Sequence, residues 1–266
     1  MKILTKLITL FIMLIYQNSI AQTIETFTVN GVEFDMVKVE HGSFQMGATP
    51  EQEEDADWDE RFVHTVNITK DFYIGRFEVT QQLWLAVVDT LPKNMELLSD
   101  DFFGDYKPVV CVSWVEAKLF IKKLNQITHK NFKLPTEAQW EYSARGGKYG
   151  FNNKYSGSDD IKEVAWYWNN SLTTNLSRST HQVGTKYPNE LGIYDMSGNT
   201  WEWCEDEWYR YGSEPTTNPR HIGTSNSQRV YRGGGWLSNA DGCRISKRSF
   251  CSPDGNDSNM GFRLAL

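Results

Sequence analysis

From residue 148 to residue 266 the sequence shows almost no helical periodicity, and this limits the folds that the chain can adopt. Glycine, asparagine, serine, aspartate and tryptophan dominate this stretch, in short runs between turn signals. Helix-forming segments are confined to the first half, and no repeat of fixed period is present. The pattern predicts one α+β domain, in which two or three helices and short strands are joined by long irregular segments.

Three segments of the first half begin with a side chain that can cap a helix N-terminus. These caps are Thr80, Ser113 and Thr136. At the last two, a glutamate or glutamine three residues later completes a capping box. We expect the first helix to run from Gln81 towards Val88 and the second to end at about Gln126. The third should end at Gly146-Gly147, because glycine adopts positive φ without strain.

Alternating apolar and polar residues predict strands on either side of an acidic stretch. Residues 22–48 predict two short strands with a turn at Asn30-Gly31. Further strands are expected at residues 63–72, 73–79 and 108–112. The acidic stretch 51–60 begins like a calcium-binding EF-hand loop but lacks its glycine and its final glutamate. We therefore expect a solvated loop there.

The N-terminus has the three regions of a secretory signal peptide. Two lysines precede an apolar run at residues 7–16, and Ser19-Ile20-Ala21 is a small-x-small cleavage pattern. The run is too short to span a bilayer comfortably, although an uncleaved anchor remains the alternative. We expect residues 1–21 to be removed near Ala21 and residues 22–266 to form the exported domain, in the periplasm, at the cell surface or secreted.

The overall charge and the cysteines restrict the partners and the covalent chemistry. A net charge of −7 disfavours attraction to nucleic acid or to an anionic membrane surface. No C-x-x-C pair of the zinc-binding kind occurs. An exported chain with four cysteines is expected to form disulfides, and the sequence does not choose among three possible pairings. The cysteines are Cys111, Cys204, Cys243 and Cys251.

A series of short motifs, spread over nearly the whole of residues 34–265, carries a family resemblance. Among them are Gly42-x-Phe44-x-Met46-Gly47, Phe77-Glu78-Val79-Thr80, Leu134-Pro135-Thr136-Glu137-Ala138, Gly198-Asn199-x-Trp201-Glu202 and Arg232-Gly233-Gly234-Gly235-Trp236. In this order they resemble the sulfatase-modifying factors, also called formylglycine-generating enzymes. The resemblance implies a loop-rich C-type-lectin-like fold, with a mixed sheet and two main helices.

The resemblance also implies a copper site, from which this chain departs. In the family, two cysteines five residues apart bind copper and oxidise a cysteine of the substrate. The matching positions here are Ser238 and Cys243. Copper(I) prefers soft thiolates, and a hydroxyl is a hard, neutral donor. We therefore expect no copper-dependent oxidase activity and a role as a scaffold or accessory protein. The alternative is an active oxidase in which Cys243 works with another thiol, such as Cys251.

The family's calcium site has its counterpart at four positions of this chain. The resemblance implies that Ca²⁺ is bound at Asp195, Gly198, Thr200 and Glu202. Two carboxylates and two carbonyls are suitable ligands for this hard cation. In the alternative, Asp195 caps a turn and Glu202 pairs with an arginine.

A second function remains open, because some relatives display a ligand-binding surface on the segment that corresponds here to residues 230–266, called the terminal segment below. A protein or glycan ligand would then contact polar and aromatic groups there. The candidate residues are Trp236, Asn239, Arg244 and Arg248. The structural alternative places Trp236 in the core and uses the arginines to lock loops through forked hydrogen bonds.

Overall fold

The computed structural model describes residues 22–223 and 227–266, so the predicted signal peptide lies outside the described residues. The first sheet joins β1 (Ile24–Val29), β2 (Val32–Val39) and β5 (Phe72–Gly75) in the order β1-β2-β5. Its pairings are antiparallel, and the turn between β1 and β2 has positive φ at Asn30 and Gly31. The predicted hairpin is therefore confirmed.

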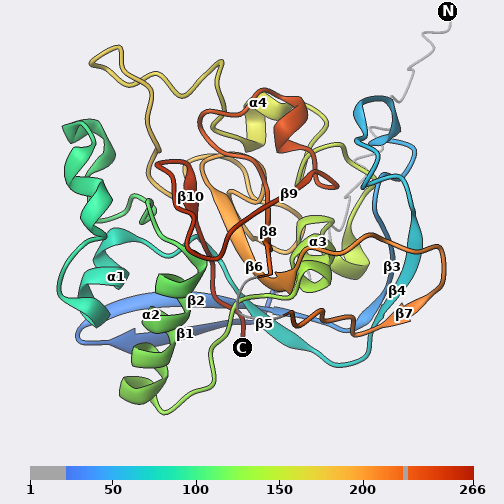
Figure 1. Cartoon of the computed structure of the whole chain (residues 1–266), viewed down its shortest axis with the longest axis horizontal. Helices are drawn as coiled ribbons and strands as arrows, with labels where there is room; N and C mark the ends of the chain where they lie inside the picture. Colours follow the sequence, from blue (N-terminus) through green and yellow to red (C-terminus); the bar gives the residue numbers. More distant parts are fainter. Residues whose placement is uncertain (1–21, 224–226) are drawn as a thin grey trace, which may run out of the picture.

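Two further sheets complete the β-structure (Figure 1). One sheet contains β3 (Gly42–Met46), β4 (His64–Ile68) and β7 (Thr216–Thr217). The other, in the order β10-β6-β8-β9, contains β6 (Trp201–Glu207), β8 (Arg229–Arg232), β9 (Arg248–Cys251) and β10 (Met260–Gly261). The edge strands β7 and β10 pair in parallel and the other pairs are antiparallel, so the fold has the mixed character that was predicted.

The predicted helix starts are confirmed. The helices are α1 (Gln81–Val88), α2 (Trp114–Thr128), α3 (Glu137–Ala144) and α4 (Ile161–Val164). Thr80 caps α1, and both predicted capping boxes form, at α2 and α3. Among the described residues after 147, α-helical structure is confined to the single turn of α4. Five 3-10 turns are η1 (Glu53–Asp55), η2 (Lys93–Leu97), η3 (Asp100–Phe102), η4 (Gly147–Tyr149) and η5 (Asp241–Cys243).

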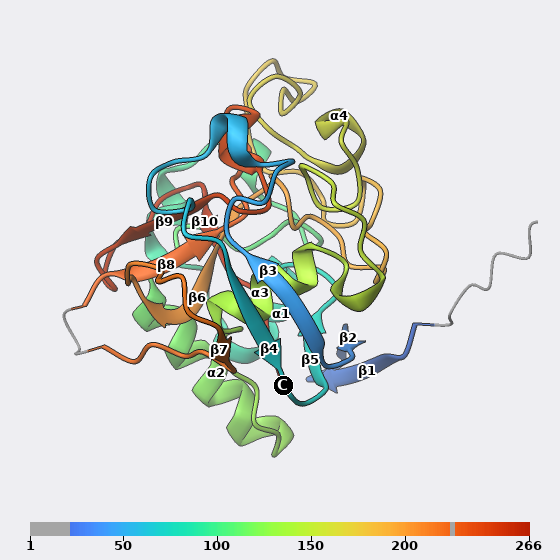
Figure 2. The ribbon, with the colours of Figure 1, turned by 90° about the vertical axis from the view of Figure 1, so that its right-hand side faces the viewer.

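The apolar side chains gather in three clusters. The largest lies under α1 and α2, where Trp84 stacks on Phe120 with ring centroids 5.0 Å apart. A second cluster surrounds α3 and includes Trp140 and Tyr142. The third is small and packs α4 against Cys243 at the opposite end of the molecule from β2 (Figures 1 and 2).

Several expectations about the chain are wrong. Residues 22–48 contain three strands instead of two, and the strand expected at residues 73–79 ends at Gly75. Residues 108–112 form one isolated bridge instead of a strand, because Cys111 has left-handed backbone at φ 57°. The acidic stretch is only partly solvated, since residues 53–55, 57 and 58 are exposed whereas Gln52, Asp59 and Glu60 are buried. The four cysteines all lie among the described residues and are free thiols, so the expected disulfide is absent.

Within residues 22–223 and 227–266, no helix is long and apolar enough to cross a bilayer.

Candidate functional site

The glycine run after β8 folds the terminal segment back on itself. Gly233 and Gly234 have φ of 98° and 72°, a region that favours glycine. A Cβ atom on Gly234 would lie 2.5 Å from the carbonyl oxygen of Gly242 and 2.7 Å from the sulfur of Cys243. Only a residue without a side chain allows this approach. The turn therefore places Cys243 in contact with Gly234, at the start of the loop that contains both residues.

Cys243 is fully buried among apolar side chains. It belongs to the cluster formed by Tyr155, Ile161, Val164 and Tyr167. Burial raises the pKa of the Cys243 thiol well above its usual range, and the nearby charge of Asp241 adds to this effect. Because the thiolate is the form that binds metals and attacks substrates, Cys243 has the environment of an inert thiol.

Ser238 closes the loop that precedes Cys243. Its hydroxyl accepts a hydrogen bond from the backbone N–H of Gly235 at 3.0 Å. Its carbonyl accepts another from the backbone N–H of Trp168 at 2.9 Å. The side chain also lies beside Gly242, the residue before Cys243. The hydroxyl that stands in place of the family's first thiol therefore has a local structural role.

Three of the four residues expected on a binding face are buried. Trp236 is 7% exposed, donates its ring N–H to the carbonyl of Ser258 and packs edge-on against Phe102. Arg244 and Arg248 are also inside the protein, where each pairs with a glutamate. Of these four residues Asn239 alone is exposed, and its side-chain amide oxygen accepts the backbone N–H of Gly242.

The exposed apolar groups of this region are not the residues that were expected. Trp168, whose backbone is bonded to Ser238, is 43% exposed, and Leu237 is 45% exposed. The guanidinium of Arg178 lies over the Trp168 ring, 3.9 Å from its centroid. Sequence reasoning missed this pair, because nothing local in residues 166–178 links them to the terminal segment.

Arg244 also explains why Glu60, at the end of the acidic stretch 51–60, is buried. Its two terminal nitrogens donate to the Glu60 carboxylate at 2.7 and 2.9 Å, and both side chains are fully buried. Burial opposes the charged form of Glu60, but the hydrogen bonds and charge of Arg244 outweigh it, so the pKa of Glu60 is lowered. The ion pair fixes the stretch to the terminal segment.

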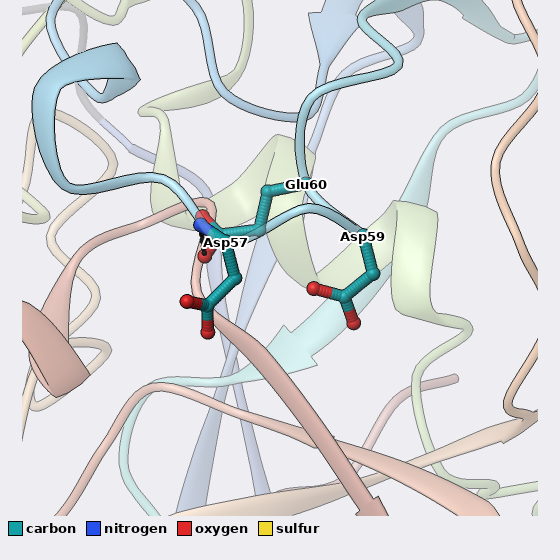
Figure 3. Close-up of side chains that lie close together, drawn as sticks. All are labelled: Asp57, Asp59 and Glu60. Atoms are coloured by element: carbon teal, nitrogen blue, oxygen red, sulfur yellow. Dashed lines mark hydrogen bonds between the residues drawn. The ribbon is translucent and has the colours of Figure 1, made fainter.

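Three carboxylates of this stretch, those of Asp57, Asp59 and Glu60, offer oxygens within 4.8 Å of one another. Figure 3 shows these three side chains, and one oxygen of Glu60 accepts the backbone N–H of Asp57 at 3.1 Å. Lys247 pairs with Asp57, and Arg244 pairs with Glu60. Cations of the chain itself therefore pair with two of these three carboxylates.

A second group of buried acids surrounds the predicted calcium positions. Glu202 is bound by Arg263 through two hydrogen bonds of 2.6 Å and by the ring N–H of Trp140. One oxygen of Asp195 accepts the N–H of Gly184, whereas the other is buried without a hydrogen-bond partner. Burial raises the pKa of Asp195 to about 6, although the Gly184 hydrogen bond acts in the opposite direction.

Glu78 joins this group, and the sequence assigned it no role. It is buried and accepts hydrogen bonds from Thr200 and Asn199. Burial raises the pKa of Glu78, and the charges of Asp195 and Glu202 raise it further. Three buried carboxylates thus face one guanidinium, that of Arg263. The unpartnered oxygen of Asp195 and the excess negative charge fit a hard cation such as Ca²⁺.

Solved structures with this fold cover almost the whole chain. Treponema denticola variable protein 1 superposes with a TM-score of 0.78 and 29% sequence identity, over 92% of this chain and 99% of that one. PvdO from Pseudomonas aeruginosa superposes with a TM-score of 0.75 and 27% identity, over 91% and 97%. The α+β fold is therefore that of C-type-lectin-like proteins, as predicted.

Sequence comparison points to the same group of proteins. The chaperone protein LppX of Paenibacillus barcinonensis is 32% identical, over 88% of this chain and 89% of its own length. The formylglycine-generating enzyme of Streptomyces coelicolor is 35% identical, but over 59% of this chain and 52% of the enzyme. The model of the sulfatase-modifying factor enzyme 1-like domain matches residues 21–266. The chain therefore belongs to the sulfatase-modifying factor family.

Proposed function

We propose that this member of the family does not oxidise cysteine to formylglycine and acts as an exported scaffold or accessory protein. The observation that carries the proposal is the environment of Cys243, a fully buried thiol with a raised pKa. The other position of the family's pair holds a serine whose hydroxyl is bonded within its own loop. One buried thiol and one hydroxyl are poor ligands for copper(I).

The remaining thiols do not offer a replacement ligand. Cys204 belongs to the apolar cluster around α3, and Cys111 and Cys251 belong to the cluster under α1 and α2. Cys243 lies in the third cluster, beside α4. Copper held by Cys243 together with another cysteine therefore has no support from the arrangement of the thiols.

An accessory role has support from the LppX protein of Paenibacillus barcinonensis, which aligns over 89% of its own length. That protein is named a chaperone, whereas the formylglycine-generating enzyme of Streptomyces coelicolor aligns over about half of its own length. We infer that this chain likewise assists another exported protein.

A copper and aldehyde assay tests the proposal. The purified domain is mixed with copper and a cysteine-containing sulfatase peptide, and mass spectrometry follows loss of the thiol and gain of an aldehyde. We expect no conversion and no copper(I) retained after dialysis against a strong chelator. The Streptomyces coelicolor enzyme is the positive control, and Ser238→Cys should retain more copper than the wild type. Stoichiometric copper with robust conversion by the wild type would refute the proposal.

A ligand-binding role is the second candidate, and the exposed ring of Trp168 beside the half-buried Arg178 favours it. A tryptophan ring beside a guanidinium is a common anchor in binding sites. On glycan and peptide arrays we expect specific retention that Trp168→Ala lowers about tenfold, as for loss of one anchor residue. Trp236→Phe is a control inside the core. If Trp168→Ala and Trp236→Phe both retain the ligand as well as the wild type does, the surface at Trp168 is not the binding site.

We also propose that Ca²⁺ binds at Asp195 and Glu202, with the carbonyls of Gly198 and Thr200. Support comes from the unpartnered oxygen of Asp195 and from the second oxygen of Glu202, which receives a single hydrogen bond. Bound calcium would supply positive charge to a group of buried acids. The proposed role is structural, since these residues hold the segment before β6 in place.

A further inference from the structure

A cavity of about 350 Å³ lies beside β2, and Leu264 of the terminal segment is among its lining residues. Its walls come from β2, the chain between Gly75 and Leu83, and a loop at Gln182-Val183. None of its lining residues belongs to the cluster around Cys243. Both views place β2 and α4 at opposite ends of the molecule (Figures 1 and 2).

The cavity follows a strand edge that has no neighbour. β2 pairs with β1 from Val32 onwards, but its pairing with β5 covers only Met36 to Val39. Next to this pairing, the carbonyl of Asp35 accepts the N–H of Arg76. The carbonyl of Arg76 then accepts the N–H of Tyr194, so the chain after β5 does not continue the sheet along β2. Among residues 22–223 and 227–266, no strand pairs with this side of residues 32–35.

Glu33 presents its backbone to the cavity. Residues two apart on a strand direct their N–H and C=O groups to the same side. Because Asp35 bonds to Arg76 on the β5 side, Glu33 faces that side too. Its N–H and C=O are therefore placed as the next rung of a ladder. An extended segment could add there as a strand, which is an established mode of peptide recognition.

The side chains of the cavity favour a basic ligand. Its lining contains the carboxylates of Glu33 and Asp35, and it contains no lysine or arginine. Glu78 also lines the cavity, but it belongs to the buried group around Asp195. The carboxylate of Asp35 pairs with a guanidinium nitrogen of Arg76 at 3.1 Å, whereas Glu33 is exposed. Among the aromatic residues of the lining, Phe34 packs on Phe27 and Phe132, and Phe77 lies under the guanidinium of Arg76. The exposed ring of Tyr106 is the one best placed to attract a ligand cation.

We propose that the open edge of β2 at Val32–Asp35 binds an extended peptide segment that carries a basic side chain. The peptide backbone pairs with Glu33, and its basic side chain enters the acidic, aromatic cavity. The inference deepens the accessory role proposed above by naming the partner's chemistry. It depends on neither copper nor calcium, so a binding assay can fail while the absence of oxidase activity stands, and the reverse also holds.

The probe is a fluorescein-labelled peptide of alternating valine and lysine, titrated with the purified domain and followed by fluorescence anisotropy. We expect saturable binding to the wild type. Glu33→Gln should weaken it about threefold, the effect of one exposed charge. Glu33→Pro should weaken it about tenfold or more, because it also removes the N–H that the peptide pairs with. The same peptide with glutamate in place of lysine should not saturate.

The matched pair at position 33 separates the backbone contribution from the charge. Thermal unfolding checks that Glu33→Pro is folded, and proline is tolerated where a strand N–H faces away from its neighbour. A second measurement needs no variant: hydrogen exchange of the Glu33 amide in the wild type should slow when the lysine peptide is added. The proposal is wrong if the lysine peptide does not saturate the wild type. Equal binding by the glutamine and proline variants, or unchanged exchange, also overturns it.

Discussion

At the scale of single residues, a few buried charges decide what the terminal segment can do. Arg244 and Arg248 have the chemistry of ligand contacts, but each is paired with a glutamate inside the protein. Ser238 has the position of a metal ligand, but its hydroxyl closes a turn. The same residue type therefore serves recognition or structure according to what surrounds it, and a sequence does not display those surroundings.

The Arg244–Glu60 pair gives a direct test of this structural role. Arg244→Met should lower the free energy of unfolding by about 3–5 kcal/mol, because it leaves the buried carboxylate of Glu60 without its partner. The double variant Glu60→Met with Arg244→Met should lose less than the sum of the two single variants. Urea unfolding measures all of them. A loss below about 1 kcal/mol for Arg244→Met, as for an exposed pair, would contradict the role.

At the scale of elements, local signals predicted helices better than strands. The caps at Thr80, Ser113 and Thr136 depend on residues three positions away, so their pattern is visible in the sequence. Residues 108–112 look like a strand because they are apolar and β-branched. In the structure their polar backbone groups find single partners instead: Cys111 donates to Asp257, and Val112 accepts from Trp203. Strand formation requires a neighbour, which only the tertiary fold supplies.

At the scale of the whole molecule, irregular segments are held by buried polar groups as well as by apolar clusters. Asn199 bonds to Glu78 and to His181, and Asp195 bonds to Gly184, so the segment before β6 is tied to distant loops. Such segments depend on side-chain partners, because their backbone has no regular ladder. The excess of buried carboxylates in this region is the physical basis for expecting calcium to stabilise the whole domain.

Thermal unfolding with and without calcium tests that expectation. For the domain stripped with a chelator, adding Ca²⁺ to about 100 times its dissociation constant should stabilise the fold by about 2.7 kcal/mol. For a domain of this size, this raises the melting temperature by roughly 5–10 °C. Mg²⁺ should have a smaller effect, and Asp195→Asn should abolish the response. A shift of equal size in Asp195→Asn would place any bound calcium elsewhere.

The sequence by itself determined the family, the α+β class, the helix caps and the first hairpin, because these depend on short-range patterns and on motif order. It also identified Ser238 at the position of a ligand cysteine. Only the tertiary structure decided that Cys243 is enclosed by apolar side chains, that Trp236 and Arg244 are buried, and that β2 has an open edge. Burial and pairing join residues far apart in the chain, so no local pattern encodes them.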